Sequence, residues 1–188
     1  MSEILAELAK LYMANPVAQI LGFIAIILGC ASYQGRTPKQ ILYLQSAGSC
    51  FWALHFFLIG APMGGFLNAF SIPRNLIYSE RGKKPWADSV LWPIGFTVVF
   101  ICAATYSYIV LDEGWVCLIS LSAQVLGNFA LRLTNAQALR IYSIIISLLW
   151  LTYNVISCSI PAVICETLNQ ISLYIALFRF STFAKSKR

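Results

Sequence analysis

The chain has 188 residues, of which 59% are apolar and 11% are charged, with 13 Lys and Arg against 7 Asp and Glu. An ordinary soluble domain has roughly 45–50% apolar and about 25% charged residues, so this composition excludes a water-exposed globule and a disordered chain. The net charge of +6 does not indicate nucleic-acid binding, because the basic residues lie in short loops between apolar runs. The chain has room for one compact membrane domain and no separate catalytic domain.

The first 15 residues have an amphipathic pattern, with apolar residues on one helical face and Glu3, Glu7 and Lys10 on the other. This pattern predicts an interfacial helix on the outer face of the membrane that the chain spans, with a frayed terminus as the alternative. It differs from a secretory signal peptide, because the segment before the apolar residues carries no positive charge and no small-residue cleavage site follows.

Seven apolar stretches follow, each close to the ~20 residues that an α-helix needs to cross the hydrocarbon core. The third and the seventh contain polar residues, but without them the charged loops would fall on inconsistent sides of the membrane. The ten-residue alternation of a membrane β-barrel is lacking, so we predict an all-α membrane protein with seven transmembrane helices. They cover residues 16–33, 41–60, 61–78, 89–111, 114–131, 141–165 with a break near Pro161, and 160–178.

The basic residues give the predicted orientation of these helices. With the loop after the first helix placed in the cytoplasm, 12 of the 13 Lys and Arg residues lie on that side, and only Lys10 lies outside. The positive-inside rule then predicts a multi-pass protein with its N-terminus outside and its C-terminus in the cytoplasm. Arg74, near the inner end of the third helix, is interpreted as reaching toward the cytoplasmic headgroups.

The two halves of the chain align without gaps at a shift of 98 residues. Seven of the 66 aligned positions are identical, which barely exceeds chance, but every loop stays in register. Because the fourth helix separates two triplets of the same orientation, the pattern predicts parallel 3+1+3 repeats. The predicted segments are the interfacial helix (1–15), the first triple-helix repeat (16–81), the linker and fourth helix (82–113), the second repeat (114–180) and a basic cytoplasmic tail (181–188).

Corresponding positions of the two repeats carry similar residues. The first helices have small residues on one face, within residues 22–32 and 120–130, which allow helices to approach closely in lipid. The second helices place Trp52 and Trp150 about 12 Å from their outer ends, at 1.5 Å per residue. Since an interfacial tryptophan belt lies nearer the helix ends, both side chains are predicted to line a cavity, with filling of the bundle core as the alternative.

The third helices carry polar pairs three residues apart, Asn68 with Ser71 and Glu166 with Asn169. Glu166 is the one carboxylate well inside a predicted span, where insertion costs on the order of 2.5–3.5 kcal/mol. It is predicted to be a solute ligand, a cation ligand or a proton carrier, and the alternative is a neutral glutamic acid held by hydrogen bonds between helices. Asn169 lies one turn below it on the same face and is predicted to line the same cavity.

His55 is the only histidine, and it aligns with Tyr153. It is predicted either to pack with one hydrogen bond or to act as a gate or a proton-relay partner of Glu166, and Tyr153 is assigned the same gate or relay role. Because the six cysteines form no C-x-x-C motif and no pair with the histidine, we predict no metal and no cofactor. A disulfide between Cys117 and Cys158, both near the outer face, is left open.

The spacing of sixteen residues in the pairs Trp52 with Asn68 and Trp150 with Glu166 resembles the SWEET/SemiSWEET sugar facilitators and the wider PQ-loop (MtN3-like) superfamily. The stretch FWALHFFLIGAPMGGFLNAFSIPRN resembles more closely the YgjV-type bacterial inner-membrane proteins. The superfamily resemblance implies a seven-helix 3+1+3 fold, a cavity lined by the two tryptophans and Asn68, and Glu166 in the place of a second asparagine. This departure puts a neutral sugar in doubt as the substrate.

The leading functional prediction is a facilitator or proton-coupled carrier of a small polar solute, working by alternating access in the bacterial inner membrane. The alternative is a non-transporting membrane module, such as a receptor, an assembly factor or a lipid-associated partner, on the same scaffold. A membrane enzyme is disfavoured, because no nucleophile–base set and no metal-binding acid pair are present. The expected partners are the solute, H⁺ and membrane lipids, and a homo-oligomer is left open. The predicted substrate-binding residues are Trp52, Asn68, Trp150, Glu166 and Asn169.

Overall fold

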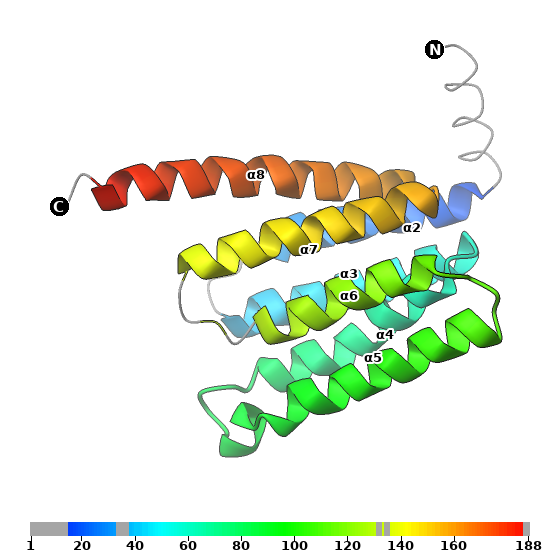
Figure 1. Cartoon of the computed structure of the whole chain (residues 1–188), viewed down its shortest axis with the longest axis horizontal. Coiled ribbons are helices and arrows are strands. Elements are labelled where there is room, and N and C mark those ends of the chain that lie inside the picture. Colours follow the sequence, from blue (N-terminus) through cyan, green and yellow to red (C-terminus); the bar gives the residue numbers. More distant parts are fainter. Residues whose placement is uncertain (1–14, 33–37, 131–132, 134–135, 186–188) are drawn as a thin grey trace, which may run out of the picture.

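The computed structural model describes residues 15–32, 38–130, 133 and 136–185. Within these residues it has seven α-helices, one short 3-10 helix and no β-strand, which confirms the predicted all-α fold. The α-helices lie side by side, and consecutive helices run in opposite directions (Figure 1). They are α2 (Pro16–Ser32), α3 (Pro38–Leu58), α4 (Pro62–Tyr78), α5 (Leu91–Ile109), α6 (Val116–Ala130), α7 (Ala136–Ile156) and α8 (Ile160–Lys185), with the 3-10 helix η1 (Pro85–Asp88) before α5.

The predicted apolar stretches correspond to these helices, and the predicted break near Pro161 is the turn between α7 and α8. The predicted interfacial helix falls on residues 1–14, outside the described residues, as does the end of the basic tail, residues 186–188. By length and hydropathy alone, Lys39–Leu58 and Leu91–Ile109 are sufficient to cross a membrane, and the apolar segments found within α2, α6, α7 and α8 are shorter.

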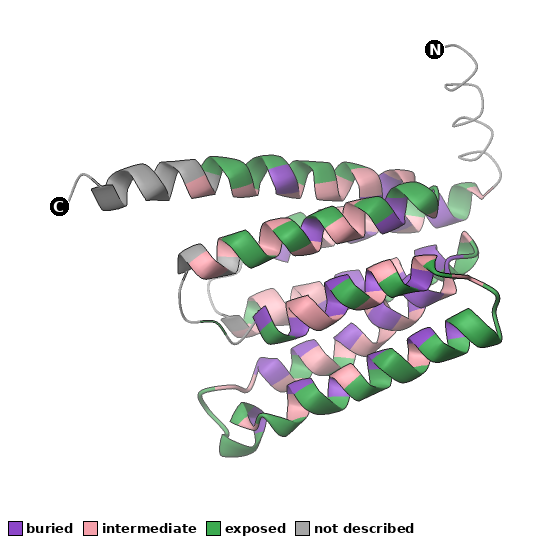
Figure 2. Ribbon diagram, viewed as in Figure 1, coloured by how far each residue is buried: buried purple, intermediate pink, exposed green. Residues whose placement is uncertain are grey.

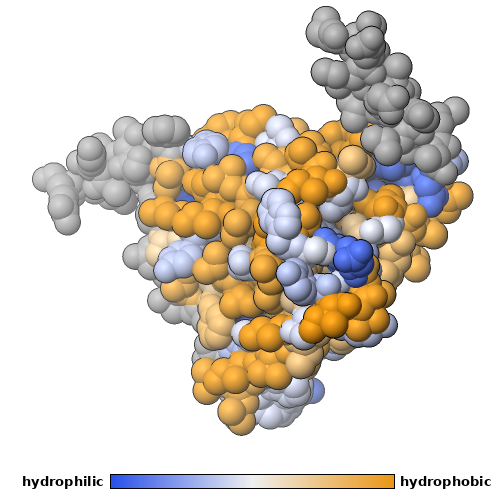
Figure 3. Space-filling view, turned by 45° about the vertical axis from the view of Figure 1, so that its right-hand side comes forward, coloured by the Kyte–Doolittle hydropathy of each residue, from blue (hydrophilic) through white to orange (hydrophobic). Residues whose placement is uncertain are grey.

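The outer surface of the bundle is apolar. Large hydrophobic side chains point outward along the helices, and Leu91 and Ile109 at the two ends of α5 are both 71% exposed. Exposed residues follow the outward faces of the helices in Figure 2, and hydrophobic residues cover most of the face in Figure 3. A soluble protein rarely exposes so much contiguous apolar surface, whereas lipid tails solvate it well.

The helices pack as two groups joined by α5. In the described structure, α3 packs between α2 and α4, and α7 packs between α6 and α8. The groups meet where α2 contacts α8 and where α4 contacts α6, and α5 covers α4 and α6. A core cluster of Met63, Leu67, Phe96 and Phe100 fills the space between α4 and α5.

Glycine permits the closest contacts between helices. A Cβ atom added to Gly22 of α2 would lie 2.8 Å from the Pro161 ring of α8, and one added to Gly64 would lie 2.8 Å from the Phe56 ring. The predicted close-packing face of α2 is thus confirmed at Gly22. It does not extend to Gly29, because an added Cβ there would have no neighbour within 4 Å.

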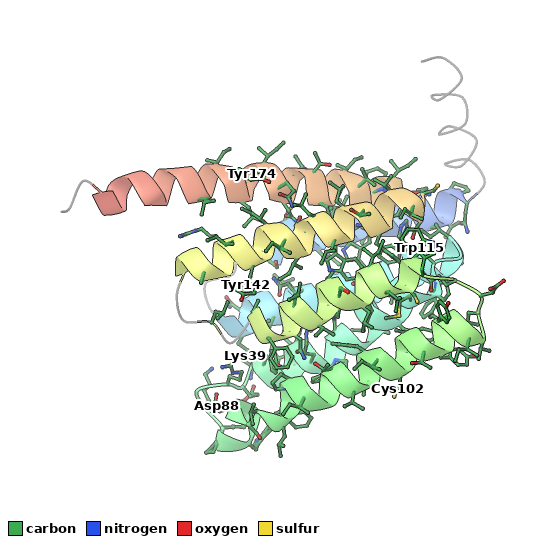
Figure 4. All side chains as sticks on the ribbon, viewed as in Figure 1. Lys39, Asp88, Cys102, Trp115, Tyr142 and Tyr174 are labelled. Atoms are coloured by element: carbon green, nitrogen blue, oxygen red, sulfur yellow. The ribbon has the colours of Figure 1, made fainter. Side chains whose placement is uncertain are left out.

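The basic residues Lys39, Arg81 and Lys84 lie at one end of the bundle, near the described loops. Figure 4 shows Lys39 and Asp88 at this end and Trp115 at the opposite end. The Lys39 Nζ atom lies 2.7 Å from Glu80 Oε1, and the Lys84 Nζ atom lies 3.3 Å from Glu80 Oε2. Hydrogen bonds from these two lysines hold the pKa of the Glu80 carboxyl group below its usual value.

The turns after α3 and α7 have the same backbone geometry. Gly60 in the first turn and Cys158 in the second have left-handed backbones, with φ angles of 76° and 53°. In each turn the residue after this position donates a hydrogen bond to the carbonyl five residues earlier, at 2.9 Å. This is the Schellman helix terminus, whose left-handed position favours glycine. Cys158 has a free thiol and is exposed, whereas Cys117 is buried, so no disulfide joins them.

Replacing Cys158 by glycine is expected to stabilise the protein by about 1 kcal/mol, because a side chain in the left-handed region costs roughly 1–2 kcal/mol and glycine recovers most of it. Equilibrium unfolding in mixed detergent micelles measures the change. Gly60→Ala is the matched control and is expected to destabilise by a similar amount, since it introduces the same strain in the first turn. If the two variants change the free energy of unfolding in the same direction, backbone strain at Cys158 is not the cause.

Candidate functional site

A cavity of about 260 Å³ lies between the two groups of helices. Its wall is formed by α2, α3 and α4 on one side and by α6, α7 and α8 on the other. Polar and aromatic side chains dominate this wall, although the bundle is coated by apolar residues. The wall includes Gln45, Gly48, Ser49, Trp52, Asn68, Ser71, Arg74, Asn75, Gln124, Trp150, Cys165 and Glu166.

A second cavity, of about 420 Å³, lies between α7 and α8. Trp150 and Glu166 belong to the walls of both cavities, so these two side chains separate the two spaces. The second wall consists of Ser143, Ile146, Ser147, Trp150, Glu166, Asn169, Ser172 and Leu173.

Four of the five predicted substrate-binding residues share the first cavity, namely Trp52, Asn68, Trp150 and Glu166. Asn169 lines the second cavity instead, where Glu166 is its neighbour along α8. The two tryptophans line the cavity while packing on buried aromatic rings, since Trp52 packs at a tilt against Phe56 and Trp150 contacts Tyr153 edge to face. Trp52 and Trp150 therefore line the cavity and also fill the bundle core, so both predicted alternatives apply to each side chain.

Glu166 is held through one of its two carboxyl oxygens. Its Oε2 atom accepts a short hydrogen bond from the Ser147 hydroxyl of α7 and a 3.5 Å hydrogen bond from the Asn169 amide. Among the described residues, none donates a hydrogen bond to Oε1. The carboxyl group is fixed by its neighbours and keeps an acceptor for a molecule in either cavity.

His55 is completely buried and lies outside both cavity walls. Its Nδ1 atom lies 2.7 Å from the Ala18 carbonyl of α2, and its Nε2 atom lies 2.6 Å from the Ser159 hydroxyl. Because a carbonyl only accepts, Nδ1 carries the proton and Nε2 accepts from Ser159. His55 thus makes two hydrogen bonds between elements where the packing alternative foresaw one, and none of its described bonds leads to Glu166.

Tyr153 is also completely buried, and it connects three elements. Its hydroxyl donates to Glu113 Oε1 and accepts from the Gly64 backbone N–H, both at 2.8 Å. The other Glu113 oxygen accepts from the Met63 backbone N–H, also at 2.8 Å. Tyr153 and Glu113 therefore satisfy free N–H groups in the first turn of α4 and close this end of the bundle.

Most wall residues of the first cavity are absent from the sequence-based site, and Arg74, Gln124 and Cys165 are three of them. Arg74, which the sequence analysis interpreted as reaching toward the headgroups, also lines the first cavity. Gln124 of α6 donates a 2.8 Å hydrogen bond to the Ser71 hydroxyl of α4. Cys165, the residue before Glu166, also lines the first cavity. Arg74 and Gln124 were detectable as polar residues inside apolar runs. The described residues contain no group of three potential metal ligands.

A helical bundle with an apolar coat and a polar interior cavity defines an integral α-helical membrane protein. A family model of bacterial inner membrane proteins, Imp-YgjV, matches residues 16–183, and the chain belongs to this family. The predicted YgjV-type relationship and the inner-membrane localisation are thereby confirmed. The comparison with curated proteins gave no match, and neither did the comparison with solved structures.

Proposed function

We propose that this protein is a carrier for a small polar solute, which binds in the first cavity between two triple-helix repeats. The observation that carries the proposal is the cavity itself. A dry, fully packed interface would suit a non-transporting scaffold, whereas this interface encloses about 260 Å³ lined by Trp52, Asn68, Trp150 and Glu166. A polar hollow in the middle of a membrane bundle is the usual place of a transported solute.

The helix contacts support the parallel 3+1+3 arrangement of the SWEET-like type. A shift of 98 residues converts α2, α3 and α4 into α6, α7 and α8. Under this shift the contacts of α3 with α2 and α4 become those of α7 with α6 and α8. The contact between α2 and α8 becomes the one between α6 and α4. The two Schellman turns also correspond, because Gly60 shifts to Cys158.

The cavity walls follow the same relation. All eight residues of the second wall correspond, at the shift of 98, to eight residues of the first. Each repeat thus presents the same eight positions of its second and third helices to a hollow space, as two halves of one carrier would. The pairs are Gln45 with Ser143, Gly48 with Ile146, Ser49 with Ser147, Trp52 with Trp150, Asn68 with Glu166, Ser71 with Asn169, Arg74 with Ser172, and Asn75 with Leu173.

The gate assigned to His55 and Tyr153 is part of the proposal. His55 bonds to Ser159, and Tyr153 approaches the Ala61 carbonyl at 3.4 Å, which is the same contact with the repeats exchanged. The contacts of His55 with Ser159 and of Tyr153 with Ala61, here called the ties, lie at the end of the bundle opposite the basic loops. The positive-inside rule assigns this end to the outer side of the membrane. In this proposal the ties hold the outer end closed, and breaking them opens the cavity outward.

Glu166 is proposed to bind the solute directly or to carry a coupled proton. The test begins with thermal unfolding of the purified full-length protein in the presence of sugars, nucleosides, vitamins, amino acids and organic acids, since a ligand of the native state stabilises it. A solute that raises the unfolding temperature is then followed into proteoliposomes across pH. We expect Glu166→Gln to reduce uptake at least tenfold or to remove its pH dependence.

The matched control is Asp112→Asn, an exposed carboxylate of the loop after α5 whose loss should leave uptake unchanged. Uptake by Glu166→Gln with an unchanged rate and an unchanged pH profile would remove Glu166 from the mechanism. A solute that binds in the cavity but never crosses the membrane would favour the receptor or assembly alternative over a carrier.

A further inference from the structure

Two charged residues interrupt the correspondence between the cavity walls. In six of the eight pairs both residues are uncharged. The exceptions are Asn68 of the first repeat, which corresponds to Glu166, and Arg74 of the first repeat, which corresponds to Ser172. The first cavity therefore contains one potential anion and one cation, contributed by different repeats. A charge in a membrane span is retained where it has a partner or a function.

Arg74 has few partners for its charge. Its Nε and Nη2 atoms donate to the same oxygen, Asn75 Oδ1, at 3.4 Å and 3.3 Å, which are long hydrogen bonds. The ion pairs among the described residues involve Lys39, Arg81 and Lys84, and Arg74 forms none of them. Since a guanidinium group has five N–H donors, most of its capacity is unused within the described structure.

We propose that Arg74 binds an anionic group of the transported solute, so that the solute is a small carboxylate-bearing molecule rather than a neutral sugar. This inference rests on the proposed carrier function. A guanidinium group recognises a carboxylate with two parallel hydrogen bonds, which fixes its orientation as well as its charge. Asn75 and Gln45 lie in the same wall and offer further amide donors.

The volume of the cavity favours a small solute over a lipid headgroup as the source of the anion. About 260 Å³ lies below the ~300–1,000 Å³ typical of pockets for drug-sized ligands. Trp52 and Trp150 supply flat apolar surfaces for the carbon skeleton. The unoccupied oxygen of Glu166 offers an acceptor for an amino or hydroxyl group of the same solute.

The test uses four solutes that share one three-carbon skeleton, namely serine, glycerate, serinamide and glyceramide. Binding to the full-length protein in phosphatidylcholine nanodiscs is measured by calorimetry, together with every solute that stabilises the protein in the wider screen. We expect the carboxylates to bind at least tenfold more tightly than the amides. Arg74→Gln should weaken carboxylate binding by about 10- to 100-fold, as expected for losing a charge-assisted pair, and Arg74→Lys should restore part of it.

Lys83→Gln is the control for the loss of one positive charge, since Lys83 is exposed in the loop after α4. Unfolding curves without solute show whether each variant is folded. Equal binding of acids and amides, or a carboxylate preference that survives in Arg74→Gln, would overturn the inference and leave the carrier function intact. Failure of every solute to bind, charged or neutral, would contradict the carrier function itself. Loss of glycerate binding on adding anionic phosphatidylglycerol would identify a lipid headgroup as the occupant.

Discussion

Replacing Gly22 by alanine is expected to destabilise the bundle by about 1–3 kcal/mol, the usual cost of overpacking. The added Cβ would lie 2.8 Å from both Cβ and Cγ of Pro161 and 3.1 Å from Nδ1 of His55. A proline ring has almost no rotamer by which to retreat, so α2 and α8 would have to separate. That separation would also stretch the hydrogen bond from His55 to the Ala18 carbonyl, which is 2.7 Å long.

Gly95→Ala is the matched control, because Gly95 is exposed in the second turn of α5 and an added Cβ meets nothing within 4 Å. It is expected to be neutral or slightly stabilising, as for other glycine-to-alanine changes inside helices. Both variants are compared by reversible unfolding in mixed detergent micelles. If Gly22→Ala unfolds like Gly95→Ala, α2 and α8 do not pack as closely as described here.

The helices and the depth of the site could be predicted from the sequence because lipid imposes simple constraints. A span must be apolar and about 20 residues long, so α2 to α6 end within two residues of their apolar runs. α7 ends at Ile156, before the predicted break near Pro161. α8 continues to Lys185, beyond the predicted residue 178, since no glycine or proline ends it. A tryptophan far from either interface is best explained by the interior, and Trp52 and Trp150 do line the cavity.

The partners of individual side chains could not be predicted, because they depend on helix rotation and on loops that are distant in the sequence. Glu113 looked like an ordinary loop acid, yet it bonds to Tyr153 forty residues later. Asn169 shares a helical face with Glu166 and lines the second cavity with it, but of the two only Glu166 also reaches the first cavity. Arg74 has a side chain long enough to reach headgroups or the interior, and its spacing does not distinguish the two.

Replacing Tyr153 by phenylalanine is expected to weaken the outer closure and to destabilise the protein by about 1–3 kcal/mol, the cost of leaving a buried polar group without its partner. The ring remains and keeps its packing on Phe56 and Trp150. The hydroxyl is lost, so the Gly64 N–H loses its acceptor and Glu113 Oε1 loses its donor. The carboxyl group of Glu113 then holds α4 through the Met63 N–H alone.

Labelling of Cys165 is used to detect this change, because this residue lines the first cavity. If the Tyr153 tie favours the closed outer end by 1.4 kcal/mol, its loss raises the open population about tenfold. Labelling of Cys165 by a membrane-impermeant thiol reagent added from the periplasmic side, quantified by mass spectrometry, should rise accordingly. Tyr108→Phe removes a hydroxyl from an exposed position of α5 and should leave labelling unchanged. If labelling increases only when the reagent is added from the cytoplasmic side, the Tyr153 contact closes the cytoplasmic end, and the proposed direction of opening is wrong.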